Sequence, residues 1–84
     1  LGNLHAEQSR WSQAQQSYFQ AHHLEPANPD YAYNLAVSLD HLRQSKLALN
    51  FYRRAEQLAS AQGRSNFDVK HARERIRILS SGLD

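Results

Sequence analysis

The sequence predicts an all-α protein, built as a stack of antiparallel helical hairpins. The first reason is an internal repeat: a shift of 34 positions places Ala14 on Ala48 and Tyr18 on Tyr52. The second reason is the spacing of the apolar residues, which recur three or four positions apart in both copies and so lie on one helical face. No segment shows the two-residue alternation of a strand, so no sheet is expected.

Five helices are expected from these patterns. They span about 1–8, 11–24, 29–42, 45–62 and 66–80. The connections between them are short, and short connections favour antiparallel neighbours.

Residues at the expected helix ends support these boundaries. Asn28 is a capping residue and Pro29 suits the first helical position, so a helix is expected to begin there. Pro26 closes the preceding helix, and Gly63 is a plausible helix stop. The segment 65–68, Ser-Asn-Phe-Asp, has the form of a capping box and predicts the start of the last helix.

Composition limits the chain to one small domain of 84 residues without cysteine and with a formal net charge of +2. Disulfides and thiol chemistry are excluded, and so small a charge excess is a weak argument for nucleic acid. No apolar run approaches the roughly 20 residues of a membrane span, so no membrane insertion is expected. Leu1 stands where a native product has Met, so we expect a fragment of a longer protein.

The repeated residues resemble the tetratricopeptide repeat (TPR) family. Leu1-Gly2-x2-His5, Ala14-x3-Tyr18-x2-Ala21 and Pro26 match one copy of its pattern, although His5 stands where Tyr is usual. The second copy is matched by Ala32, Leu35, Ala36, Leu39, Ala48, Tyr52 and Ala55. The resemblance implies a short right-handed superhelix, with an incomplete first repeat (1–28), a second repeat (29–62) and a capping helix (65–80).

The same resemblance implies a non-catalytic module that binds a peptide or protein in a concave groove. By position, the groove residues are Asn3, Glu7, Asp30, Tyr33, Asn34, Val37, Asp40 and His41. Four of them have a second interpretation. Tyr33 can instead pack on the next helix, Asn34 can bond to neighbouring backbone, and Asp40 and His41 can serve solubility near a helix end. The segment 31–42 resembles bacterial TPR proteins of envelope, pilus or secretion assembly, which implies a cytoplasmic or periplasmic scaffold.

Catalytic and metal-binding motifs are lacking. The five histidines form no HExxH motif, the serines form no G-x-S-x-G motif, and three glycines do not make a phosphate loop. We therefore expect no enzyme activity, no metal and no cofactor.

Three alternatives to the groove remain at this point. The incomplete first repeat should leave apolar surface uncovered near Leu1, Leu4 and Trp11, which would favour self-association into a homo-oligomer. The last helix carries Lys70, Arg73, Arg75 and Arg77, which would suit nucleic acid if they shared one face, but their spacing spreads them around the helix. Asn3 and Asn34 coincide with asparagines of the carboxylate clamp found in some family members. That clamp also needs lysines and an arginine in flanking helices, of which the first lysine would precede Leu1 and the others would need a full third repeat.

Overall fold

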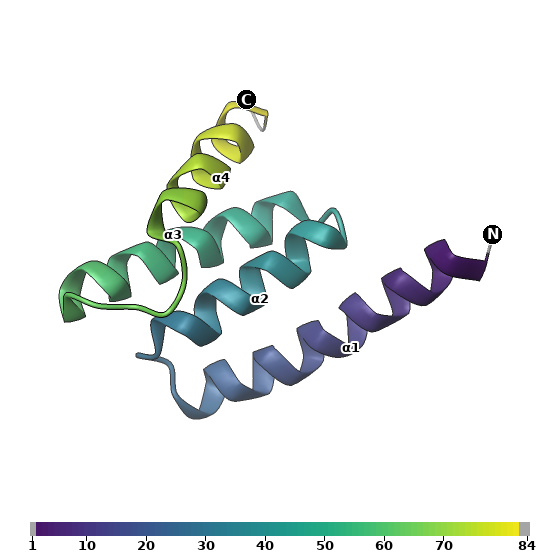
Figure 1. Cartoon of the computed structure of the whole chain (residues 1–84), viewed down its shortest axis with the longest axis horizontal. Helices are drawn as coiled ribbons and strands as arrows, with labels where there is room; N and C mark the ends of the chain where they lie inside the picture. The colour runs from purple at the N-terminus through teal and green to yellow at the C-terminus, as the bar shows by residue number, and fades with distance from the viewer. Residues whose placement is uncertain (1, 83–84) are drawn as a thin grey trace.

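A computed structural model describes the backbone of residues 2–82 and the side chains of residues 7–82. Its four helices are α1 (Gly2–Leu24), α2 (Pro29–His41), α3 (Ser45–Gln62) and α4 (Val69–Gly82) (Figure 1). All regular structure within the described residues is helical, which confirms the all-α class. The roles expected for Leu1 and for the side chains of Asn3, Leu4 and His5 lie outside the described residues.

The first two expected helices, 1–8 and 11–24, are one continuous helix, α1. The expected hairpin in the first repeat is therefore wrong, and the structure has four helices where five were expected. The physical reason lies between Gln8 and Trp11, where no Gly or Pro interrupts the helix. Only the family pattern predicted a turn there, and no local sequence signal did.

Helix α2 begins and ends as the sequence predicts to within one residue. The Asn28 side chain accepts hydrogen bonds from the backbone N–H groups of Asp30 (2.9 Å) and Tyr31 (3.4 Å), and Pro29 occupies the first turn. Helix α3 has the expected bounds, and Gly63 follows it with φ of 73°, a left-handed conformation that glycine adopts without strain.

Helix α4 starts three residues later than expected. The Asp68 side chain accepts a hydrogen bond from the backbone N–H of Lys70 at 2.9 Å and so caps the helix. Ser65, the expected capping residue, instead donates its hydroxyl to the carbonyl of Phe67 at 3.3 Å. The capping-box interpretation of 65–68 is therefore wrong, and these residues belong to the connection between α3 and α4.

The core lies between α2 and α3, which form an antiparallel hairpin and the most extensive helix contact (Figure 1). Tyr52 and Leu35 are the largest side chains that are almost completely buried. The other buried apolar residues of α2 and α3 are two leucines and five alanines: Leu39, Leu49, Ala32, Ala36, Ala48, Ala55 and Ala59. The many alanines let the two helices approach closely. Every repeat-matched residue of the second copy lies in this core.

Helices α1 and α4 flank this hairpin on opposite sides. Helix α1 packs on α2 and helix α4 packs on α3, so α2 lies between α1 and α3. Ala14, Tyr18 and Ala21 of α1 are only half-buried, in contrast to their counterparts in α3. Leu24, which the repeat pairs with Leu58, is 79% exposed and does not belong to the core.

His22 is a half-buried histidine of α1 whose Nδ1 has no hydrogen-bond partner among the described residues. Its ring contacts the ring of Phe51 edge-on, with centroids 5.4 Å apart. Burial lowers the pKa of His22, and the nearby Arg54 and His23 lower it further. The folded protein therefore favours the neutral imidazole at this position.

We predict that His22 makes the folded state less stable in acid. Below about pH 6.5 the unfolded chain binds a proton at His22 more readily than the folded chain does. The free energy of unfolding therefore decreases as the pH is lowered. Thermal unfolding should show a smaller drop in Tm between neutral and mildly acidic buffer for His22→Gln than for the wild type. His23→Gln should reduce the drop less than His22→Gln does, because His23 lowers the pKa of His22 less than burial and Arg54 do. Equal drops in His22→Gln and wild type would contradict this role.

Candidate functional site

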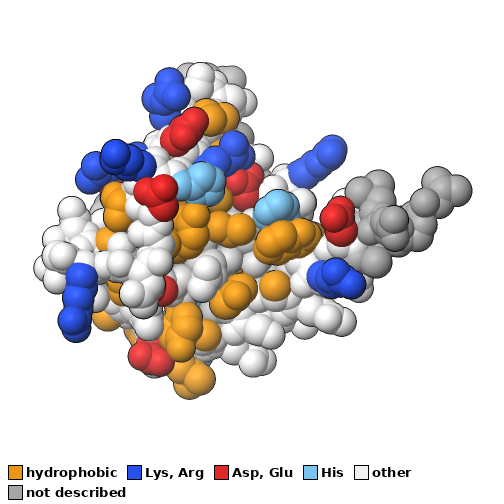
Figure 2. Space-filling view, viewed as in Figure 1, with side chains coloured by type: hydrophobic (Ala, Val, Ile, Leu, Met, Phe, Trp, Pro, Cys, Tyr) orange, Lys and Arg blue, Asp and Glu red, His pale blue; other side chains and the backbone are white. Residues whose placement is uncertain are grey.

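The candidate site is an open pocket of about 290 Å³ between α2 and α4. It is lined by Val37, Asp40, His41, Tyr52, His71 and Arg75. The first three were among the groove residues expected from the sequence. Figure 2 shows hydrophobic side chains between two histidines on the face of the molecule that it draws.

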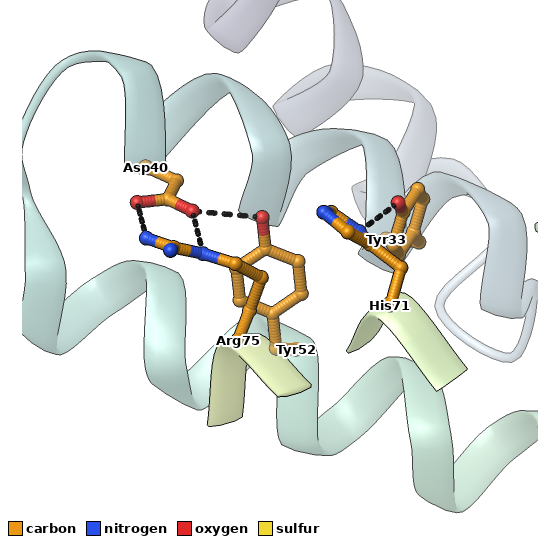
Figure 3. A network of polar contacts seen from close by, with 5 residues as sticks. All are labelled: Tyr33, Asp40, Tyr52, His71 and Arg75. Atoms are coloured by element: carbon orange, nitrogen blue, oxygen red, sulfur yellow. Dashed lines mark hydrogen bonds and ion pairs between the residues drawn. The ribbon is translucent and has the colours of Figure 1, made fainter. Parts of the chain in front are cut away.

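An ion pair between α2 and α4 forms one wall of this pocket. The guanidinium of Arg75 donates from Nε to Oδ2 of Asp40 at 2.7 Å and from Nη2 to Oδ1 at 2.8 Å (Figure 3). The hydroxyl of Tyr52, from α3, donates to the same Oδ2 at 3.0 Å. Asp40 was expected to face a partner, but its carboxylate joins three helices of its own chain.

Burial strengthens this network. The side chains of Arg75 and Asp40 are 29% and 18% exposed, and Tyr52 is almost completely buried. Burial raises the pKa of the Tyr52 hydroxyl far above its usual value, and the charge of Asp40 raises it further. The hydrogen bond to Asp40 raises the pKa of Arg75. Tyr52 therefore stays protonated and Arg75 stays charged across the physiological range.

Tyr33 makes a second link between α2 and α4. Its hydroxyl shares a hydrogen bond of 2.6 Å with Nδ1 of His71 (Figure 3). Its ring stacks on Phe67 with centroids 4.4 Å apart. Burial raises the pKa of Tyr33, and Asp68 adds to the shift. Of its two expected roles, the structure therefore favours packing on the next helix.

Asp30 lies away from the pocket, at the first turn of α2. Its carboxylate accepts hydrogen bonds from the backbone N–H of Asn66 at 2.9 Å and from the Asn66 side chain at 3.1 Å. It therefore fixes the connection between α3 and α4. It also lines a separate polar pocket with Arg64 and Gln62, so the expected groove residues do not form one surface.

The remaining expected groove residues lie in different surroundings. His41 is exposed and stacks on Trp11 of α1, with ring centroids 3.8 Å apart and planes 4° apart. Asn34 is half-buried, and its carbonyl accepts a hydrogen bond from Ser38 at 3.0 Å. Glu7 is exposed on α1 and lines another pocket, while the side chain of Asn3 lies outside the described residues.

Sequence reasoning missed three residues of this pocket, namely Tyr52, His71 and Arg75. Tyr52 was assigned to the core from the repeat, and no local pattern indicates its bond to Asp40. Arg75 was one of four basic residues in the last helix, and its partner lies 35 positions earlier in the chain. Sequence spacing on a single helix carries no signal for such a pair.

Two further side-chain contacts, one from Arg73 and one to Ser80, join α4 to α3. Arg73 approaches Glu56 to 3.5 Å, with side chains 61% and 33% exposed. Arg53 of α3 donates to the hydroxyl of Ser80 at 3.0 Å. Two arginines of the basic set therefore face different neighbouring helices, as expected from their spread around α4.

Metal and membrane signals are lacking in the described part of the chain. No group of three or more potential metal ligands occurs among the described residues. None of the helices within them is long and apolar enough to cross a membrane.

Comparisons of the chain with protein families, with curated proteins and with solved structures return no match. The binding properties of the pocket therefore follow from its own residues. These are an apolar side chain at Val37, two histidine rings at its sides, and a guanidinium whose partner is internal.

We predict that the Asp40–Arg75 pair stabilises the fold far more than the Arg73–Glu56 pair. A partly buried, bidentate ion pair should show a coupling energy of about 1–3 kcal/mol. The exposed pair should contribute at most about 1 kcal/mol. Double-mutant cycles with Asp40→Asn and Arg75→Gln, and with Glu56→Gln and Arg73→Gln, measured by urea unfolding, compare the two. Coupling energies of equal size would contradict the role given to Asp40.

Proposed function

We propose that this chain is a non-catalytic protein-binding module of the TPR type, which binds a peptide or protein segment on the face formed by α2 and α4. The observation that carries the proposal is the pocket between these helices, where Val37 and His41 are left available to a partner. No catalytic role is proposed for any residue.

The burial pattern supports a TPR-type hairpin for α2 and α3. The repeat-matched positions of the second copy include Ala32, Leu35, Tyr52 and Ala55, and all of them are buried. In this interpretation α4 takes the place of the helix that would open a third repeat, and the face shared by α2 and α4 corresponds to the concave side. The first repeat departs from the pattern, because α1 is continuous.

The internal links of α4 favour a groove that exists before the partner arrives. Asp40 and Tyr33 each bond to a residue of α4, so they fix the spacing between the two helices. A site whose walls are held in place loses less conformational entropy when a ligand binds. These two side chains therefore shape the groove, while Val37, His41 and the exposed edge of His71 are left for contacts.

The nucleic-acid alternative has less support. Arg75 is neutralised by Asp40, and Arg73 lies beside Glu56, so two of the four basic residues of α4 already have acidic neighbours. A scaffold role in bacterial envelope, pilus or secretion assembly rests on the resemblance alone. It enters the proposal only because it indicates where a partner would be sought.

We predict that peptides selected from a random library on the immobilised domain bind through Val37 and His41. The double variant Val37→Ser with His41→Ala should raise the Kd of such peptides at least tenfold, equivalent to about 1.4 kcal/mol, because it removes contacts and leaves the links of α4 intact. Fluorescence anisotropy with labelled peptides measures the change.

The matched control is Asn50→Ala with Gln57→Ala, two exposed positions of α3 outside the pocket. It should leave the Kd unchanged, and circular dichroism should show the same helix content in all variants. Peptides that bind the Val37 and His41 variant as tightly as the wild type would exclude this groove as the binding site.

A further inference from the structure

Helix α1 extends beyond the helix on which it packs. It has 23 residues against 13 in α2, which corresponds to about 35 Å against about 20 Å. Trp11 stacks on His41, which is the last residue of α2. The turns of α1 that precede Trp11 therefore lie beyond the end of α2, as Figure 1 shows.

The packing face of α1 continues into this extension. Tyr18 and Ala14 lie on the face that packs on α2, and helical periodicity carries the same face through Trp11 to Arg10 and Glu7. An open pocket of about 340 Å³ is lined by Glu7, Arg10, Trp11 and Ala14. We call these four residues the α1 edge. Trp11 is half-buried and Glu7 and Arg10 are exposed, so the edge is accessible.

The charges of the α1 edge are complementary to those of a second copy of the chain related by a two-fold axis. Glu7 and Arg10 have opposite charges one helical turn apart, and neither has an ion-pair partner within 4.0 Å among the described residues. When two such helices pack antiparallel, Glu7 of one copy faces Arg10 of the other, and the reverse pair forms by symmetry. A second copy therefore satisfies both charges through two symmetric pairs.

The remaining residues of the edge fit a helix-on-helix contact. Ala14 is small, which allows a neighbouring helix to approach closely, and the Trp11 indole supplies apolar area beside the charged pairs. The opposite face of α1 carries three exposed polar residues, Gln13, Gln16 and Gln20, and the ring of Phe19, which is 52% exposed. The α1 edge thus combines an apolar ring with two charged residues, whereas the opposite face offers Phe19 among polar side chains.

We propose that the α1 edge is a contact between two copies of this chain, related by a two-fold axis, in which Glu7 of each copy pairs with Arg10 of the other. The contact is small, so the dimer is weak and depends on concentration. Its charged residues, Glu7 and Arg10, do not line the pocket between α2 and α4, and the two surfaces meet only where Trp11 stacks on His41.

Sedimentation equilibrium of the whole chain over a wide concentration range tests this contact. The wild type should show a monomer–dimer equilibrium that weakens as salt is added. Glu7→Arg and Arg10→Glu should each raise the dimer Kd about tenfold, because each places like charges opposite one another at two symmetric positions. The double variant with both changes should restore the wild-type Kd. An equimolar mixture of the two single variants should form a heterodimer.

The control is the pair of charge reversals Glu25→Arg and Arg54→Glu, both at exposed positions outside the α1 edge. They should leave the dimer Kd unchanged. A wild type that stays monomeric at every concentration, or a dimer whose Kd ignores the reversals at Glu7 and Arg10, would overturn the proposal. So would single variants that lose the dimer and a double variant that fails to recover it.

Discussion

The carboxylate of Asp40 is the point at which three helices of this protein are joined. It lies on α2, accepts two hydrogen bonds from Arg75 of α4 and one from Tyr52 of α3, and is largely shielded from water. The apolar contribution of α4 is small, since only Ala72 and Leu79 are buried in it. The position of α4, and with it the shape of the pocket, therefore depends on this polar network as well as on the apolar contacts of Ala72, Ile76 and Leu79. Removing one partner would leave an uncompensated charge in a partly dry site.

Side chains that face a groove and side chains that build it are difficult to separate by position alone. Tyr33 and Asp40 lie off the apolar stripe of α2, where a ligand contact is a reasonable expectation. In the structure they contact α4, because α4 covers the part of α2 on which they lie. Val37 and His41 lie on the same side and remain available. Whether a residue on this side of α2 contacts α4 or remains available is decided by where α4 lies.

Local signals predicted much of the fold. Asn28, Pro29 and Gly63 act through the backbone of their own turns, so the limits of α2 and α3 follow from the sequence. The 34-residue repeat likewise marked the buried positions of the hairpin. The break expected in α1 had no such local signal and is not found. The pairing of Asp40 with Arg75 links residues 35 positions apart, which no helical period can indicate.

The stacking order has a consequence for cooperativity. The extensive helix contacts join only chain neighbours, so the structure is close to one-dimensional, and a stack of this kind frays from its outer members inward. The bonds from Tyr33 and Asp40 to α4 skip one helix and oppose fraying at that end. Helix α1 also reaches past its neighbour, but through the edge-on contact of His22 with Phe51 of α3, in which Nδ1 of His22 has no hydrogen-bond partner among the described residues. Amide protons of α1 should therefore exchange with solvent through more local unfolding than those of α4. Hydrogen exchange in α4 should reflect global unfolding more closely than hydrogen exchange in α1.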